Sequence, residues 1–180
     1  MSFSRPIELK NASLSADKEP LVCAPLVGAS EEAVLSELAA IVPKKPELLE
    51  WRVDFFSGIA DTGRVVALAQ AIRGKAGGIP VIFTRRSIRE GGTAIPLDED
   101  QVLAMYQAVC RSGAVDLLDY ELSVEPRHFE AAVALARETG VRLIASFHNF
   151  QETPSADTLL AKFVAMEQAG RLLRDGWRKT

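Results

Sequence analysis

Residues 79–84 read Ile-Pro-Val-Ile-Phe-Thr, a short and nearly continuous apolar run. Such a run is typical of a strand in a parallel sheet, where both faces of the strand are buried. Farther along the chain, apolar residues return at steps of three and four between Val102 and Val109, which is the period of an amphipathic helix. The segment therefore predicts one unit made of a buried strand followed by a helix.

This strand–helix pattern recurs along the chain. The other apolar runs are residues 21–27, 48–53, 115–120 and 141–147, and the other helical stretches are residues 34–41, 65–72, 129–136 and 158–170. The runs start roughly every 30 residues, which is the size of a βα unit. We expect a single domain over residues 1–180, with a cap segment at 1–20, five βα units at 21–170 and an atypical tail at 171–180.

The composition is that of a globular protein and argues against several other classes of protein. Of the 180 residues, 48% are hydrophobic and 25% charged, as in an ordinary globular domain. The 21 basic and 24 acidic residues give a net charge of −3, which argues against a nucleic-acid surface. Cys23 and Cys110 form no disulfide framework or zinc spacing. No apolar stretch reaches the ~20 residues of a membrane span and no signal core begins the chain, so we expect a cytoplasmic protein.

Two architectures share this pattern of units. One is an open, doubly wound sheet, which 180 residues would complete. The other is a (β/α)8 barrel, which typically takes ~250 residues. The periodicity alone favours the doubly wound sheet.

Polar residues gather where the predicted strands end. They are Glu50 and Arg52 in the second run, Arg85, Arg86 and Glu90 after the third, Asp119 and Glu121 at the fourth, and His148 after the fifth. Charged groups inside apolar strands carry a desolvation cost of several kcal/mol unless they are paired. In parallel βα folds these strand ends form the functional site, so we expect a site there.

Each of these residues also has a purely structural interpretation. Glu50 and Arg52 point the same way along a strand and could pair with each other. Asp119 and Glu121 could be a structural pair that closes the end of the core, and His148 could be a buried histidine whose hydrogen bonds are satisfied.

The remaining polar residues divide by position. Arg85 and Arg86 point in opposite directions, so at most one faces the site and the other covers a helix. His128, near a helix start, is expected at the solvated surface.

The combination of residue types indicates proton-transfer chemistry on a small anionic, hydroxylated substrate. His148 can act as a base near neutral pH, and arginines can hold a carboxylate in a bidentate fork. Residues 25–30 lack the G-x-G-x-x-G spacing of a phosphate loop, and no second histidine or cysteine cluster joins His148 as a metal ligand. We expect neither a metal nor an organic cofactor.

Taken in order, four motifs resemble those of type I 3-dehydroquinate dehydratase. They are Glu50-Trp51-Arg52-x-Asp54, Phe83-Thr84-x-Arg86-Ser87 with Glu90-Gly91-Gly92, Asp116-x-x-Asp119-x-Glu121-Leu122, and Ser146-x-His148-Asn149-Phe150 with Thr153-Pro154-Ser155. The resemblance covers residues 20 to 170. It implies a (β/α)8 TIM barrel, here an incomplete barrel of about five βα units, and a homodimer.

The resemblance also implies an activity and a set of roles. The family dehydrates 3-dehydroquinate to 3-dehydroshikimate in the shikimate pathway, which leads to aromatic amino acids, through an imine with a lysine and without a cofactor. His148 would be the general acid and base, with Glu90 as its orienting partner. Glu50, Arg52 and Arg86 would bind the substrate, the two arginines on the carboxylate side.

The chain departs from the family where the imine-forming lysine is expected. That lysine lies on the sixth strand, and counting without gaps brings its position to about Asp175, where no such strand follows. Lys162, on the preceding helix, should face outward, and Lys179 lies in the tail. We therefore expect the chain alone to be inactive, and one hypothesis is that residues 171–180 are an out-of-frame ending.

Two other interpretations remain open. The chain could be a non-catalytic protein of the same lineage, which binds an acid of the shikimate type through Glu50, Arg52, Arg86 and His148. It could also be a five-stranded, doubly wound module that binds a small molecule. In an incomplete barrel the first and fifth strands would be open edges, which favours association between chains.

Overall fold

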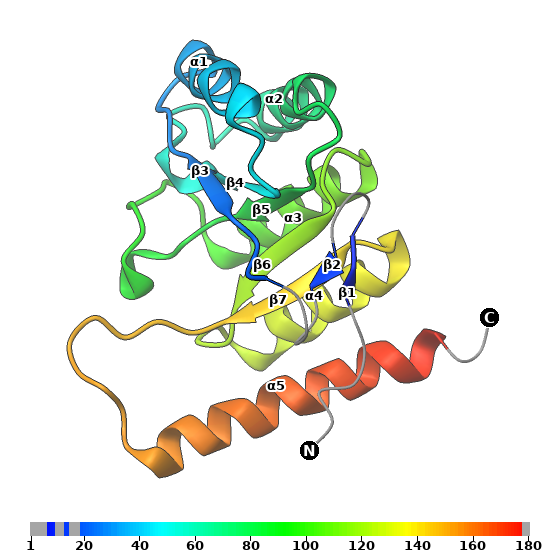
Figure 1. The fold of residues 1–180 in the computed structure, drawn as a ribbon. Helices are drawn as coiled ribbons and strands as arrows, with labels where there is room; N and C mark the ends of the chain where they lie inside the picture. Colours follow the sequence, from blue (N-terminus) through cyan, green and yellow to red (C-terminus); the bar gives the residue numbers. More distant parts are fainter. Residues whose placement is uncertain (1–6, 10–12, 15–18, 178–180) are drawn as a thin grey trace.

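Five parallel strands form the central sheet, and they lie side by side in the order in which they occur in the chain (Figure 1). They are β3 (Cys23–Leu26), β4 (Leu48–Arg52), β5 (Val81–Thr84), β6 (Leu117–Glu121) and β7 (Arg142–Ser146). The computed structural model describes residues 7–9, 13–14 and 19–177, and side chains are described for residues 7–9 and 19–168. The five predicted strands are confirmed, each within about two residues at either end.

A helix follows each strand of the sheet. The helices are α1 (Glu31–Ile41), α2 (Thr62–Lys75), α3 (Glu99–Arg111), α4 (Pro126–Thr139) and α5 (Ala156–Trp177). Side chains of Ser30, Asp61 and Asp98 accept hydrogen bonds from the first turns of α1, α2 and α3 and so fix where these helices begin. Pro126 opens α4, where its missing N–H costs nothing, and Gly140 ends it with a φ of +73°.

Helices α1 to α4 cover one face of the sheet, which we call the outer face. Alternate strand residues, among them Leu49, Phe83 and Leu118, join α1 to α4 in one buried apolar core. Right-handed crossovers that always move to the next strand place every helix on the same face. A doubly wound sheet has helices on both faces, so the preference for that architecture from periodicity alone is wrong, and five successive units of a (β/α) barrel are what the chain forms.

The inner face changes character along the strands. Near the strand starts, Leu48, Ile82 and Leu117 form a second apolar cluster, against which Leu9 and Leu21 pack. Leu9 directly follows β1 (Ile7–Glu8), which pairs with β2 (Ser13–Leu14) in a small antiparallel hairpin that lies beside the strand starts in Figure 1. Toward the strand ends the inner positions become polar, so the apolar half is closed by the N-terminal segment and the polar half remains accessible.

The sheet ends at β3 on one side and at β7 on the other. Within the described part of the chain, each of these strands pairs with one neighbour only. Around β3, the apolar side chains of Val22 and Val27 are exposed. The sheet is therefore open at both edges, as an incomplete barrel requires.

Helix α5 is longer than expected. It begins at Ala156, runs beside α4 in Figure 1 and continues to Trp177, so the expectation that the helix stops near Gly170 is wrong for residues 171–177. A single glycine costs a helix only about 1 kcal/mol, and Leu172, Leu173 and Arg174 are good helix formers. The apolar side chains of Leu160, Phe163 and Val164 are exposed on this helix. No helix in the described ranges is long and apolar enough to cross a membrane.

Candidate active site

The polar half of the inner face and the loops that follow it bring the predicted site residues together. We call this group the inner polar cluster; its members are Glu50, Arg52, Arg86, Glu90, Asp119, Glu121, Ser146 and His148. Because side chains alternate along a strand, Glu50 and Arg52 share the inner face with Asp119 and Glu121. Adjacent parallel strands end at the same edge, and this places residues from four βα units in one region.

Arg86 lies at the centre of the cluster and is buried. Its Nη2 donates to Asp119 Oδ1 at 2.9 Å, and its Nη1 donates to Glu121 Oε1 at 3.3 Å. Nη1 also donates to Ser146 Oγ at 2.8 Å and lies 3.8 Å from Glu90 Oε2. The guanidinium therefore holds three carboxylates together, and Asp119 and Glu121 are both partners of one arginine, as well as neighbours that close the core.

The pKa of the Asp119 carboxyl group reflects the burial of this region. Burial raises its pKa above the ordinary value for aspartate, and the neighbouring Arg86 and the hydroxyl of Ser146 oppose that rise. The Ser146 hydroxyl donates to Asp119 Oδ1 at 2.7 Å. Removing Arg86 would leave these carboxylates without their counter-charge.

Arg52 pairs with Asp54, and the alternative interpretation, in which Glu50 and Arg52 pair with each other, is not what forms. Arg52 donates from Nε and Nη2 to the two oxygens of Asp54 at 2.8 and 2.9 Å, and this bond raises the pKa of Arg52. The chain turns through η2 (Val53–Phe55) directly after β4, which brings the Asp54 carboxylate back against the guanidinium. Among the described residues, Glu50 has no hydrogen bond or ion pair, so its carboxylate stays free on the inner face.

His148 is held by Glu90. The carboxylate of Glu90 is 2% exposed, and its Oε2 accepts from the backbone N–H of His148 at 2.9 Å and lies 3.0 Å from Nδ1 of the same residue. Its Oε1 accepts from the hydroxyl of Ser123 at 2.5 Å. Since a carboxylate accepts, this contact places the imidazole proton on Nδ1 and leaves Nε2, on a side chain that is 40% exposed, for another partner.

A tight loop positions Glu90. Residues Ile88–Glu90 form the short helix η3, and Gly91 follows with a φ of +86°, a conformation that favours glycine. The N–H of Gly92 bonds to the carbonyl of Ser87 at 2.8 Å. A Cβ on Gly92 would lie 1.9 Å from the carbonyl oxygen of Arg86, so this position has no room for a side chain.

Replacing Gly92 with alanine is expected to destabilise the fold by about 1–3 kcal/mol, because the backbone of Arg86 must move. The control is Gly74→Ala in the last turn of α2, where an added Cβ meets nothing within 4 Å and helix propensity should improve stability. Denaturant unfolding followed by circular dichroism measures both. Equal stabilities for the two variants would contradict the role assigned to this loop.

Cys23 offers a chemical reporter of Glu50. It lies in register with Leu48 on the inner face, and its pKa is raised to about 11, first by loss of hydration and then by the carboxylate of Glu50. We expect slow alkylation by iodoacetamide at pH 8, and severalfold faster alkylation in Glu50→Gln, because the thiolate then meets no negative charge. The buried Cys110 is the internal control, and an unchanged rate at Cys23 would show that Glu50 does not face it.

Two other predicted positions fall outside the cluster. Arg85 points to the outer face, where its backbone N–H donates to the hydroxyl of Tyr106 at 2.7 Å and its side chain pairs with Glu99, so the prediction that Arg85 and Arg86 diverge is confirmed. His128 is buried rather than solvated, which corrects the prediction. Its Nε2 lies 2.8 Å from Asp100 Oδ1, because the first turn of α4 packs against the first turn of α3.

Three residues of the site had no predicted role. Asp54 also accepts from the backbone N–H groups of Arg86 and Thr93, at 3.3 and 3.1 Å, and so ties the loop after β5 to the end of β4. Ser123 and Ser146 bond to Glu90 and Asp119. For Asp54 the signal was available in the sequence as a carboxylate two residues beyond Arg52, and for Ser146 as its place in the motif with His148; for Ser123 no signal distinguishes it from a surface serine.

The described residues contain no group of three histidine, cysteine, aspartate or glutamate side chains arranged to hold a metal ion. The carboxylates that do converge, those of Asp119, Glu121 and Glu90, surround the guanidinium of Arg86. What the arrangement offers chemically is an imidazole nitrogen oriented by a buried carboxylate, beside a free carboxylate and a partly exposed arginine.

Comparison with known proteins agrees with this arrangement. Residues 22–174 match the family model for type I 3-dehydroquinase. The chain is 64% identical over 170 residues to the 3-dehydroquinate dehydratase of Aromatoleum aromaticum, an alignment that covers 94% of this chain and 65% of that protein. It is 53% identical over 154 residues to that of Geobacillus thermodenitrificans, with 86% and 58% covered. The chain thus spans less than two thirds of the length of these curated relatives.

Solved structures give the same result. The crystal structure of 3-dehydroquinate dehydratase from Geobacillus kaustophilus superposes with a TM-score of 0.88 at 44% identity, covering 92% of this chain and 64% of that one. That of the type I enzyme from Clostridium difficile superposes with a TM-score of 0.87 at 27% identity, with 92% and 65% covered. The family model, the similar sequences and the similar structures agree: this chain belongs to the type I 3-dehydroquinase family.

Proposed function

We propose that this chain carries the substrate-binding and acid–base groups of a 3-dehydroquinate dehydratase, which removes water from 3-dehydroquinate to give 3-dehydroshikimate. The observation that supports this most directly is His148, whose Nδ1 is bound to the buried Glu90 while Nε2 is free. A histidine fixed in one tautomer can accept a proton from carbon and return it to a leaving group.

The proposed reaction needs two proton movements that one imidazole can perform. Nε2 of His148 accepts the proton from the carbon next to the substrate carbonyl, and the electron pair of that C–H bond forms the new double bond. The C–O bond of the neighbouring hydroxyl breaks as this double bond forms, and the same nitrogen donates its proton to the departing oxygen so that water leaves. Glu90 is a positioning residue in this scheme, since it bonds Nδ1 and stabilises the imidazolium that forms.

The other members of the inner polar cluster are proposed to hold the substrate. Glu50 is free to accept hydrogen bonds from substrate hydroxyls. Arg52, which is fixed by Asp54 and partly exposed, would bind on the carboxylate side. The resemblance also implies that Arg86 binds the substrate carboxylate, but Arg86 is buried among three carboxylates. To bind the substrate directly, its guanidinium would have to replace one of these ion pairs by a bond to the substrate.

The inner polar cluster contains no lysine. Lys162, on α5, places its ammonium 3.6 Å from the centre of the Phe147 ring, and Lys179 lies outside the described residues. We propose that neither of these lysines replaces the imine-forming lysine of the family, and that the 180 residues by themselves bind substrate without turning it over. We further propose that the assembled enzyme acts in the shikimate pathway in the cytoplasm, as a homodimer.

Binding of 3-dehydroquinate to the 180-residue chain tests the substrate assignment. We expect binding by isothermal titration calorimetry, and a loss of about tenfold in affinity in Arg52→Gln, which corresponds to one charge-assisted hydrogen-bond pair. Arg111→Gln is the control, because Arg111 is an exposed arginine on α3 that pairs with Glu138. Equal binding by both variants would refute the assignment of Arg52.

Turnover requires the missing lysine to be supplied. For this purpose we define the completed chain as this chain fused to the part of the Aromatoleum aromaticum relative that follows the aligned region. If the lineage has lost its catalytic function and only binds an acid, the completed chain will bind 3-dehydroquinate and still not dehydrate it. If the proposal is right, the fusion will form the product.

A further inference from the structure

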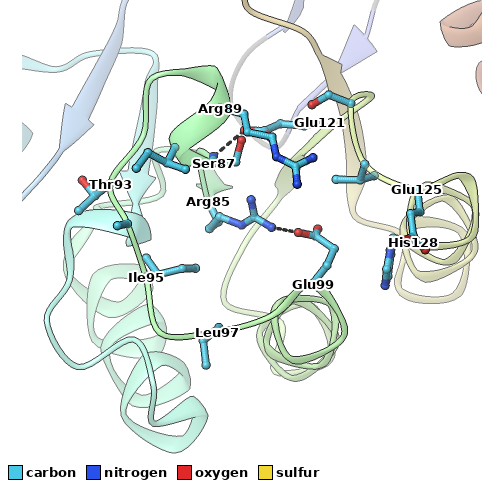
Figure 2. Close-up of a pocket in the computed structure, with 14 residues that line it drawn as sticks. Arg85, Ser87, Arg89, Thr93, Ile95, Leu97, Glu99, Glu121, Glu125 and His128 are labelled. Carbon is cyan, nitrogen blue, oxygen red and sulfur yellow. Dashed lines mark hydrogen bonds and ion pairs between the residues drawn. The ribbon is translucent and has the colours of Figure 1, made fainter.

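A second pocket adjoins the inner polar cluster, with which it shares Glu121, and lies between the loop of residues 87–97 and the segment that joins β6 to α4 (Figure 2). We call it the loop pocket; its volume is about 390 Å³, within the range of small-molecule sites. Its walls are partly apolar, with Ile95 and Leu97 from the loop and Val124 from the opposite side. Figure 2 shows the side chains of Arg85 and Arg89 projecting into the space between these walls.

The carboxylates that line the loop pocket are already engaged. Glu99 pairs with Arg85 and accepts from the hydroxyl of Tyr120 at 2.7 Å. Glu121 is bound to Arg86 and accepts from the backbone N–H of Ser87 at 2.7 Å. Glu125, at the rim, pairs with Arg127 at 2.9 Å. Each of these carboxylates therefore already has an arginine partner, although Oε2 of Glu121 accepts no hydrogen bond among the described residues.

Arg89 is the charged group without a counter-charge among the described residues that line this pocket. Its side chain is exposed at the mouth, and no ion pair or hydrogen bond to it occurs within the described part of the chain. Deeper in the pocket, four buried side-chain atoms also lack hydrogen-bond partners: Nε of Arg85, Oγ of Ser87, Oε2 of Glu121 and Nδ1 of His128. The pocket therefore combines one uncommitted positive charge, unsatisfied polar atoms and apolar walls.

We propose that the loop pocket is an accessory binding site for a small monocarboxylic acid with an apolar body. The carboxylate would pair with Arg89, and the body would pack on Ile95, Leu97 and Val124. One uncommitted positive charge matches one negative charge, whereas a dianion such as phosphate would face the carboxylates of Glu99, Glu121 and Glu125 as well. A ligand of one ring with a short side chain fits the volume.

This site is separate from that of the dehydratase substrate, although the two are neighbours. Ile88, Arg89 and Ser123 line both the loop pocket and the adjacent pocket that contains His148. Leu97 and Val124 line the loop pocket, whereas Phe147 and Phe150 line the pocket of His148. Signals from these two pairs of residues therefore distinguish where an acid binds.

Benzoate is the probe for the 180-residue chain, with the neutral benzamide as its matched control. In an NMR titration that follows methyl, aromatic and backbone amide signals, we expect benzoate to shift the methyl signals of Ile95, Leu97 and Val124 and benzamide to bind at least about tenfold more weakly. Arg89→Gln should raise the Kd of benzoate about tenfold or more, because the charge-assisted pair is lost. Ala94→Glu, which adds a carboxylate at an exposed lining position, should have the same effect, and Arg111→Gln should have none.

Three results would overturn the proposal. One is equal affinity for benzoate and benzamide, which would mean that Arg89 recognises no charge. Another is an unchanged Kd in Arg89→Gln; since Arg89 is exposed, this variant should fold normally. The third is a set of shifts confined to Phe147, Phe150 and the inner polar cluster, which would place benzoate in the other site.

Discussion

Replacing His148 with alanine in the completed chain is expected to lower kcat for 3-dehydroquinate dehydration by about 10²–10⁴-fold, the usual contribution of a general acid–base group. The reason is the geometry of Nε2, which faces away from Glu90 and is available to the substrate. Because one nitrogen both removes and returns the proton, its loss affects both halves of the elimination. The measurement is the rise of enone absorbance under saturating substrate.

The control for this variant is the chain's other histidine. His128→Gln keeps an amide that can donate to Asp100, and His128 lies outside the inner polar cluster, so its kcat should stay close to that of the unaltered completed chain. Circular dichroism and binding of 3-dehydroquinate check that His148→Ala remains folded and still binds. A variant that binds substrate and retains full kcat would refute the role proposed for His148.

Replacing Arg86 with glutamine is expected to destabilise the chain by about 3–5 kcal/mol at pH 7. Removing one partner of a buried ion pair leaves an uncompensated charge, and here Asp119, Glu121 and Glu90 would all lose a cation. This is a large part of the stability of an ordinary domain. Arg111→Gln, at an exposed pair with Glu138, should cost under about 1 kcal/mol.

The destabilisation by Arg86→Gln should depend on pH in a defined direction. Burial raises the pKa of Asp119 in the folded chain above its value in the unfolded chain, and Arg86 opposes this rise. A carboxyl group with a raised pKa favours the folded state at acid pH, and that contribution is lost as pH rises through its folded pKa. Without Arg86 the pKa of Asp119 rises further, so the penalty should be greatest at neutral pH and smaller in acid.

Urea unfolding at pH 7 and at pH 4.5 measures this difference. The decrease in the free energy of unfolding that Arg86→Gln causes should be smaller at pH 4.5 than at pH 7. A penalty that is the same at both pH values would show that the carboxylates around Arg86 are not the source of the destabilisation.

Much of the fold follows from short-range patterns. The buried runs and the helical stripes predict five strands and the helices between them, because burial on both faces and a period of 3.6 residues leave clear marks in sequence. The order of the strands does not follow from periodicity, since open and closed sheets are built from the same units. The resemblance to a family implied the barrel, and the order β3-β4-β5-β6-β7 agrees with it.

The site was predictable in its location but not in its pairings. Polar residues at strand ends predict that Glu50, Arg52, Arg86 and His148 meet, because parallel strands end at one edge. Pleat direction alone suggested a pair of Glu50 with Arg52, whereas the turn at η2 brings Asp54 to Arg52 instead. Such a contact depends on the path of a loop, which no alternation of residues encodes.

His128 shows the same limit on the outer face. Its position in the first turn of a helix suggested that the side chain is exposed to solvent. Helices α3 and α4 instead pack so that His128 contacts Asp100. Which side of a helix start is covered depends on how two helices cross, and that depends on the whole sheet beneath them.

Enone formation from 3-dehydroquinate, measured side by side for the 180-residue chain and the completed chain, tests the central proposal most directly. We predict no product from the chain alone and steady product formation by the completed chain, which His148→Ala slows by about 10²–10⁴-fold. Turnover by the chain alone would mean that its own residues replace the family's lysine. A folded completed chain that binds 3-dehydroquinate but forms no enone would contradict the proposal that these residues form the acid–base half of a dehydratase.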